Sequence, residues 1–297
     1  DLRFTASDGS TLLDYWIESK VDSDNAVIWV EVAADLSTVD QEICIYYGKS
    51  DATTTSSLTN TFYASDDASG TLTDKWTVIG SGTWNYVSGE IRSATPADQQ
   101  IEFKTPHPVG CVIECDVKKS TTVYVGLIAL GAKQQASNQF YTAQLRPNDG
   151  STIWRQSIWN YGTPIGYGEY NISANTYYKM SFYVDTNYQK FTINDGAIGD
   201  TIVTTDSNNT GTGTLLQSYV HSAGSYDYFK NFRIRKFVSP EPTHGVWNDI
   251  HIVTTDTILK SLGLTVTNDI DMLIRKLNLT VTNNIDIFIQ KSDTLCS

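Results

Sequence analysis

The sequence predicts an all-β protein, and three features support this prediction. Thr, Ser, Asn, Gly and Tyr are plentiful, whereas long stretches rich in Ala, Leu, Glu and Lys, which favour helices, are missing from the chain. β-Branched and aromatic side chains fit half-buried pleated surfaces, and Asn, Gly and Ser supply turns. Short apolar runs bounded by such turns recur along the chain at the spacing of a β-sandwich or barrel.

The first region, residues 1–61, is expected to form a small β-domain. Three short runs rich in β-branched and aromatic residues, at 12–18, 26–32 and 42–47, predict its strands. The Ser- and Thr-rich stretch at 50–61 is typical of a connector.

The second region, residues 62–238, is expected to form a two-sheet jelly-roll sandwich, because it holds many strand candidates. An Asn-Asp-Gly turn at 194–196 predicts a hairpin after one of them. The candidate strands lie at 89–93, 100–104, 112–117, 123–130, 140–145, 152–158, 177–184, 190–193, 215–220 and 228–237.

The third region, residues 239–297, contains an internal repeat that predicts further strands. The eight residues from Leu264 recur, with one change, as the eight residues from Leu279, fifteen positions later. Apolar and polar residues alternate within each copy, as in a half-buried strand. Such a short unit cannot bury its own apolar face, so we expect it to stack on other strands or to join a neighbouring chain, which predicts self-association. The residues expected to make inter-chain contacts are Leu264, Val266, Ile270, Leu279, Val281, Ile285 and Cys296.

Charge and hydropathy exclude two kinds of partner. The chain of 297 residues has a formal net charge of −12, so it repels phosphate backbones and anionic lipid, and we expect no nucleic-acid partner. No run of 18 apolar residues is present, so we expect no membrane span. A start at Asp1, already inside a strand pattern, indicates a processed or truncated chain.

The four cysteines do not form a metal-binding motif. Cys111 and Cys115 lie in one strand-like run, about 13 Å apart at the rise of a strand, which is too far for a disulfide between them. We expect both to be small buried side chains. The disulfide state of Cys44 and Cys296 stays open at this point.

The first 60 residues resemble a known family. The segments that carry the resemblance are DLRFT at 1–5, DG at 8–9, LLDYWIE at 12–18, VIWV at 27–30 and IYYG at 45–48. Together they resemble the domain of unknown function DUF2341, which is common in archaeal and some bacterial surface proteins. Members have strands before the first motif, so the resemblance implies an incomplete domain unless a neighbouring chain fills the gap.

The second region resembles the concanavalin A-like lectin/glucanase (LamG-like) jelly rolls that often follow this domain. The likeness runs from Asp66-Asp67 through Trp76 and Trp84 to NFRIRK at 231–236. It implies a sandwich that binds or hydrolyses polysaccharide.

The acidic residues of this region do not match a hydrolase. Glucanases of this fold place three acids on one strand face, spaced as Glu-x-Asp-x-(x)-Glu, because two carboxyl groups must flank the sugar bond. Here Glu114 and Asp116 are followed by Lys118 and Lys119, so the third acid is missing. We therefore expect no enzymatic activity and two solvated carboxylates.

An aromatic cluster around a predicted Gly-rich loop at 162–168 is the candidate carbohydrate site. Flat rings with nearby amides suit sugar stacking. The alternative is packing at the edge of a core or between subunits, where Tyr and Trp are also favoured. The candidate residues are Trp154, Trp159, Tyr161, Tyr167 and Tyr170.

Two kinds of modification or cofactor site also have candidates. Acidic turns at Asp66-Asp67 and at Asp185 with Asn187 offer oxygen ligands for calcium, although such residues are also common in turns without metal. Sequons predict glycosylation on a secreted protein. The acceptor residues are Asn171, Asn208 and Asn278.

Two functions follow from these features. The first is a non-enzymatic structural subunit of an extracellular assembly, such as a filament, sheath, surface layer or virion fibre, joined by strand contacts between chains. The second is a lectin-like adhesion module that binds polysaccharide or cell-surface glycan. Both place the protein outside the cell or on a virion surface, and a glycoside hydrolase comes third.

Overall fold

The structure is a computed structural model that forms two compact units, Asp1–Ser56 and Ser57–Glu241, which we describe separately. It describes residues 2–22, 24–34, 41–47, 51–94, 98–121, 126–136, 139–147, 154–194, 201–220, 223–237 and 241. The predicted boundary between the first two regions was at 61/62. The predicted strand repeat and its contact residues, Leu264, Val266, Ile270, Leu279, Val281, Ile285 and Cys296, lie outside the described residues.

The described residues of the N-terminal unit form two small antiparallel sheets. One has the order β2 (Leu12–Leu13), β1 (Arg3–Ala6), β5 (Ile43–Tyr46), and the other pairs β3 (Tyr15–Val21) with β4 (Asn25–Val30). Its buried core is centred on Phe4, Tyr15 and Ile28.

The prediction of one strand at 12–18 is wrong, because two strands of different sheets occupy this range. The chain leaves the strand pattern at Asp14, whose carbonyl oxygen accepts a hydrogen bond of 2.9 Å from the amide of Glu31. Tertiary pairing therefore divides an apolar run that looks continuous in the sequence.

The second unit is a sandwich of two antiparallel sheets, which confirms the predicted all-β jelly roll. The seven-stranded sheet has the order β15-β14-β13-β12-β19-β10-β7; in the eight-stranded sheet the order is β18-β17-β16-β11-β20-β9-β8, and β6 also pairs with β20. The seven-stranded sheet contains β7 (Trp76–Ile79), β10 (Asp98–Phe103), β12 (Leu127–Ala136), β13 (Gln139–Pro147), β14 (Trp154–Asn160), β15 (Thr163–Glu169) and β19 (Gly213–Tyr219). The eight-stranded sheet contains β6 (Ala64–Asp66), β8 (Trp84–Val87), β9 (Glu90–Ser93), β11 (Cys111–Lys119), β16 (Tyr178–Val184), β17 (Gln189–Ile193), β18 (Thr201–Thr204) and β20 (Asp227–Lys236).

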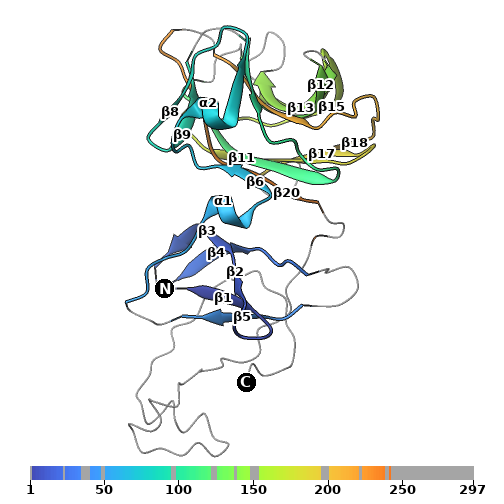
Figure 1. The fold of residues 1–297 in the computed structure, drawn as a ribbon. Helices are drawn as coiled ribbons and strands as arrows, with labels where there is room; N and C mark the ends of the chain where they lie inside the picture. The colour runs from blue at the N-terminus through green and yellow to red at the C-terminus, as the bar shows by residue number, and fades with distance from the viewer. Residues whose placement is uncertain are drawn as a thin grey trace, which may run out of the picture. The chain divides into compact units, whose positions relative to one another are not determined.

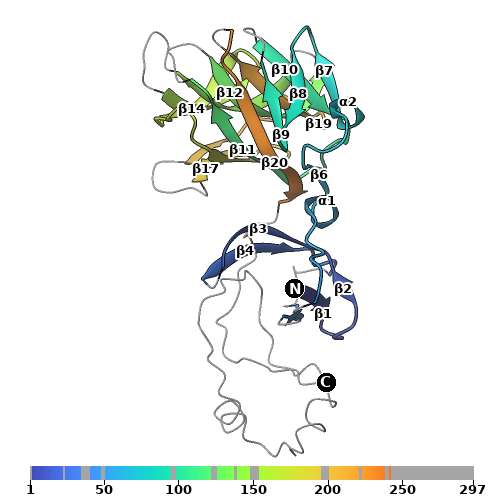
Figure 2. The same ribbon diagram turned by 90° about the vertical axis from the view of Figure 1, so that its left-hand side faces the viewer.

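The two sheets lie face to face. Figure 1 shows β12, β13 and β15 on one side of the sandwich and β11, β17 and β18 on the other, and Figure 2 shows β11, β20 and β9 side by side. Trp76 of the seven-stranded sheet packs against Phe232 of the eight-stranded sheet, with ring centroids 4.9 Å apart. Cys111 and Cys115 are free and buried in this core, as predicted.

Within the described ranges two short helices, α1 (Leu58–Thr61) and α2 (Leu72–Lys75), precede β6 and β7. No helix in the described part of the chain is long and apolar enough to cross a bilayer.

The prediction of a Gly-rich loop at 162–168 is wrong, because most of this stretch is the strand β15. Gly166 lies where β15 approaches β18. A Cβ atom at this position would come within 2.7 Å of side-chain carbons of Ile202 and Thr204. Glycine here lets the edges of the two sheets meet, and it does not mark a turn.

Candidate functional site

The outer face of the seven-stranded sheet is built by strand alternation. On β14, Ile158 is buried in the core, so Arg155, Ser157 and Trp159 point away from it. The antiparallel register of β13 and β14 places Arg146 directly opposite Arg155. Residues nine positions apart in the sequence thus become neighbours on one surface.

Trp159 is held in a defined orientation on this face. Its indole nitrogen donates a hydrogen bond of 2.9 Å to the hydroxyl oxygen of Ser157. The guanidinium carbon of Arg146 lies 4.5 Å from the centroid of the Trp159 ring. A cation over an aromatic face is attracted by the ring quadrupole, so Arg146 and Trp159 fix each other.

A second cation–aromatic pair lies beside the first. Tyr167 on β15 is opposite Ser157, and its side chain is 70 % exposed. The guanidinium carbon of Arg155 is 5.8 Å from the Tyr167 ring centroid. We call these four side chains, Arg146, Arg155, Trp159 and Tyr167, the aromatic–arginine face.

Two buried glutamines continue this face toward the middle of the sheet. The register places Gln144, Ala129 and Gln217 in one row across three strands. The side-chain amide nitrogen of Gln217 donates to Asp98 at 2.9 and 3.1 Å. The Oε1 atoms of both glutamines are buried and have no hydrogen-bond partner among the described residues. Buried acceptors of this kind suit a ligand that carries hydroxyl groups.

The structure brings together only part of the predicted aromatic cluster. Tyr161 lies between β14 and β15 and packs edge-on against Phe140, with ring centroids 5.5 Å apart. Tyr170 packs against Tyr178 and accepts a hydrogen bond from Asn194, so its ring is used in packing. The side chain of Trp154 lies outside the described part of the structure.

Sequence reasoning missed Arg146, Arg155, Gln144 and Gln217. The alternation of the strands at 140–145, 152–158 and 215–220 is the signal that locates such residues, because the positions that alternate with the buried ones share the outer face.

Asp66, one of the residues of the predicted calcium site, is engaged by side chains of the protein. Asp66 is buried and accepts hydrogen bonds from the Trp76 indole at 2.5 Å and the Tyr86 hydroxyl at 2.8 Å. The Lys75 ammonium lies 3.0 Å from Asp66 and 3.2 Å from Asp67. A fixed cation and two hydrogen-bond donors thus contact the carboxylate oxygens of Asp66.

An ammonium group, that of Lys133, also lies next to Asp185 and contacts its backbone. Its carboxylate accepts from the amide of Thr186 at 2.7 Å, and Lys133 donates to the backbone carbonyls of Asp185 and Thr186. Asn187 follows in an exposed turn. No group of three His, Cys, Asp or Glu residues in the described ranges is arranged to hold a metal ion, and calcium binding at Asp185 stays a prediction.

The expectation of two solvated carboxylates is wrong for Glu114. This residue lies on β11 between core residues, so it points to the outer face of the eight-stranded sheet, where it is only 2 % exposed. Its carboxylate accepts from Arg233 at 2.7 Å and from Arg235 at 3.3 Å. Burial alone would raise the pKa of Glu114, but the two guanidinium groups outweigh it and lower the pKa to about 2.

Asp116, two positions along the same strand, accepts a hydrogen bond of 2.7 Å from Asn231. Both acids belong to the eight-stranded sheet, whereas the aromatic–arginine face belongs to the other sheet. The two sets of side chains therefore cannot act on the same sugar.

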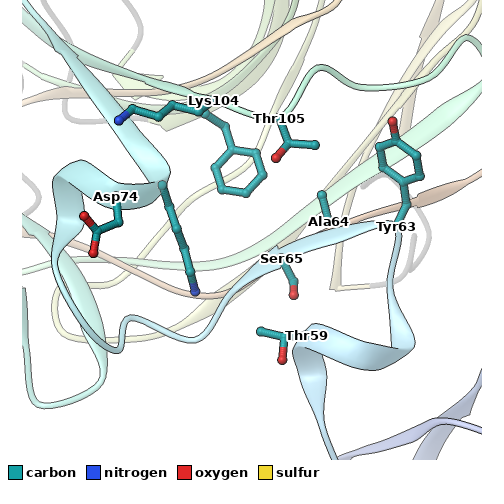
Figure 3. Close-up of a pocket in the computed structure, with 9 residues that line it drawn as sticks. Thr59, Tyr63, Ala64, Ser65, Asp74, Lys104 and Thr105 are labelled. Atoms are coloured by element: carbon teal, nitrogen blue, oxygen red, sulfur yellow. The ribbon is translucent and has the colours of Figure 1, made fainter.

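A pocket of about 300 Å³ lies beside α1, α2 and β6 (Figure 3). Tyr63 lies on one side of it and Asp74 on another. Its cationic side chains donate within the protein: Lys75 to Asp66, and Lys104 to a backbone carbonyl at 2.5 Å. Tyr63 is exposed to a similar extent as Tyr167, so it can serve as a control residue outside the aromatic–arginine face.

Asn171 and Asn208 are exposed in the sandwich, and Asn278 lies outside the described residues. The side-chain amide of Asn208 donates to Asp206 at 3.1 Å. A glycan on Asn208 would have to replace or rearrange this hydrogen bond.

Comparison with protein families confirms the resemblance of the first region. Residues 1–84 match the family described as "Domain of unknown function (DUF2341)". The match extends beyond the N-terminal unit as far as the start of β8. No curated protein matches the chain.

Several solved structures are similar in fold. A carbohydrate binding module CBM66 from Bacillus subtilis is 16 % identical, with a TM-score of 0.43, and the comparison covers 55 % of this chain and 96 % of that one. A protein of unknown function with a galectin-like fold from Bacillus subtilis is 11 % identical, with a TM-score of 0.46 and coverage of 59 % and 96 %. The β-glucanase of Bacillus licheniformis is 14 % identical, with a TM-score of 0.44 and coverage of 58 % and 97 %.

Proposed function

We propose that the sandwich is a lectin-like module that binds polysaccharide on the aromatic–arginine face. The observation that carries this proposal is the exposed ring of Tyr167 beside the fixed pair of Trp159 and Arg146. Sugar rings present axial C–H groups that pack on flat aromatic faces, and their hydroxyl groups need nearby hydrogen-bond partners. The buried amide oxygens of Gln144 and Gln217 supply acceptors on the same surface.

Binding without hydrolysis is the second part of this proposal. Hydrolysis of a glycosidic bond requires two carboxyl groups that flank it, one of them able to donate a proton. Glu114 is ion-paired with Arg233, and its lowered pKa keeps it ionised near neutral pH. Its place on the opposite sheet separates it from the proposed sugar site. We propose that the module acts outside the cell, on a cell or virion surface.

The test is a glycan array followed by affinity electrophoresis of variants. Tyr167→Ala should weaken binding by about tenfold or more, the scale of one lost aromatic contact. Tyr63→Ala removes a comparably exposed tyrosine at the pocket of Figure 3, and its binding should equal that of the unmodified protein. An array without any hit, or equal losses in the two variants, would rule out the proposed site.

A second candidate function, self-assembly through the N-terminal unit, has its own supporting observation. The small core of this unit leaves large apolar side chains exposed on or beside its strands, with Leu12 at 69 % and Tyr47 at 55 %. Exposed apolar residues at strand edges favour strand addition by a second copy of the chain. The protein would then be a structural subunit of a surface assembly that also carries the glycan-binding sandwich.

Sedimentation equilibrium of the full chain tests this second candidate. Oligomers that dissociate in Leu12→Glu, but persist when the same change is made at the exposed Val109 of the sandwich, would support it. A monomer at all concentrations would eliminate it.

A further inference from the structure

We infer that the polysaccharide recognised by the aromatic–arginine face is acidic, and that its uronic-acid carboxylates bind to Arg146 and Arg155. This inference rests on the proposed function and narrows it to one class of glycan.

The first observation is that the two arginines are direct cross-strand partners. Arg146 on β13 pairs with Arg155 on β14, and both side chains are on the outer face. Two guanidinium groups at directly opposite positions can bind anionic groups of one ligand from two adjacent strands. Glu169 of β15 is the next residue in this row, opposite Arg155, so the three adjacent positions still carry an excess of positive charge.

The second observation is that aromatic rings restrict both guanidinium groups. Arg146 lies over Trp159, which Ser157 in turn orients, and Arg155 lies over Tyr167. A planar guanidinium that is already oriented loses less conformational entropy when it binds a ligand. It carries five N–H donors in a fork that matches the two oxygens of a carboxylate, so it binds a ligand in addition to any protein partner.

The third observation is the combination of groups along the face. The two guanidinium groups suit carboxylates, the exposed Tyr167 ring suits the flat side of a sugar, and the buried amide oxygens of Gln144 and Gln217 suit hydroxyl groups. A uronic-acid polymer presents all three features in each sugar unit. Neutral glycans offer no carboxylate to either guanidinium group.

The net charge of −12 opposes the approach of any acidic polymer, so the two arginines must supply the attraction locally. The protein as a whole repels polyanions, so an acidic glycan must be held by charge concentrated at one place. An acidic glycan carries one carboxylate per sugar unit, so its charge density along the chain is lower than that of a nucleic-acid duplex. Loss of either arginine should therefore remove most of the affinity.

The experiment uses the full chain and pairs of polymers that differ only in charge. Binding to polygalacturonate and to alginate is compared with binding to the same polymers after methyl esterification, which removes the carboxylate charge and keeps the sugar. We expect the acidic forms to bind at least about tenfold more tightly, with affinity that falls as salt is added. Arg146→Gln and Arg155→Gln should each lose this preference.

Arg92→Gln is the matched control. Arg92 belongs to β9 of the eight-stranded sheet, and its guanidinium carbon lies 4.8 Å from the centroid of the Tyr226 ring. The substitution therefore removes the same charge and the same kind of stack from the other sheet of the sandwich. It should leave binding unchanged. Thermal unfolding of each variant verifies that the sandwich stays folded.

The outcomes separate the two proposals. Equal binding of acidic and esterified polymers, or binding of neutral glycans alone, would overturn the acidic preference and leave the glycan-binding face in place. Equal losses in Arg92→Gln and Arg146→Gln would overturn it as well, because affinity would then follow net charge alone. No binding to any glycan would eliminate both proposals.

Discussion

The two outer faces of the sandwich use arginine in opposite ways. On the eight-stranded sheet, Arg233 is fully buried and its charge is met by the buried carboxylate of Glu114. On the seven-stranded sheet, Arg146 and Arg155 lie over aromatic rings, and one of these rings, that of Tyr167, is largely exposed. The first arrangement satisfies the cation within the protein and serves stability. The second leaves the Tyr167 ring accessible, and we propose that it serves recognition.

This comparison predicts that stability and binding respond to different substitutions. Changes around Glu114 should affect the free energy of unfolding and leave glycan binding intact. Changes on the aromatic–arginine face should weaken glycan binding and have only small effects on the free energy of unfolding. Four predictions test this separation, and the effect expected of each is smaller than that of the one before.

The largest effect should come from Glu114→Gln, which leaves the buried Arg233 without its ion-pair partner. Removing one member of a buried pair costs about 3–5 kcal/mol of unfolding free energy. Urea denaturation measures this loss. Glu169→Gln makes the same chemical change at an exposed site and should cost less than about 0.5 kcal/mol. Equal effects in the two variants would contradict the structural role of Glu114.

Acid should reproduce part of this loss. The pKa of Glu114 is lowered in the folded state from its ordinary value of 4.5 to about 2, so the ionised form stabilises the fold above pH 4.5. This contribution, on the order of 3 kcal/mol, should disappear as the pH falls from 4.5 toward 2. Urea denaturation at a series of pH values detects it. If Glu114→Gln lost stability over this window as steeply as the unmodified protein, another group would be responsible.

A smaller effect on stability is expected for Arg146→Gln. The substitution removes the cation over Trp159, a contact that stabilises a protein by about 0.5–1 kcal/mol at a partly exposed site. Urea denaturation followed by tryptophan fluorescence should show this change. A loss as large as that of Glu114→Gln would mean that Arg146 serves mainly the fold.

The smallest effect on stability is expected for Tyr167→Ala. The ring is largely exposed, so its removal should alter the unfolding free energy by less than about 0.5 kcal/mol. Thermal unfolding tests this expectation on the same samples used for glycan binding. Marked destabilisation would show that the Tyr167 ring is part of the packing of β15.

The sequence predicted regular features of the sandwich well where the pattern was local. The strand predicted at 112–117 is β11, Cys111–Lys119, and the strand predicted at 190–193 is β17, Gln189–Ile193. Strands that pack closely against others were harder to find. β15 was missed because its glycines suggest a loop, whereas Gly166 is needed for the approach of β18.

The candidate site was only half predictable, for a related reason. Trp159 and Tyr167 stand out because aromatic residues are conspicuous near glycines, and the structure places both on one face. Tyr170 has the same appearance in the sequence but packs inward against Tyr178. Composition does not distinguish an aromatic side chain that packs from one that binds.

By itself, the sequence determined the all-β class, the strand alternation, the acidic net charge and the resemblance of the first region to DUF2341. These properties depend on local pattern and composition. Only the tertiary structure decided which charges meet. Arg146 and Arg155 share a face because of the register of one hairpin, and Glu114 finds Arg233, 119 positions away, because β11 pairs with β20. Whether a charge is buried against a partner or presented to a ligand depends on such long-range pairing, which no local pattern encodes.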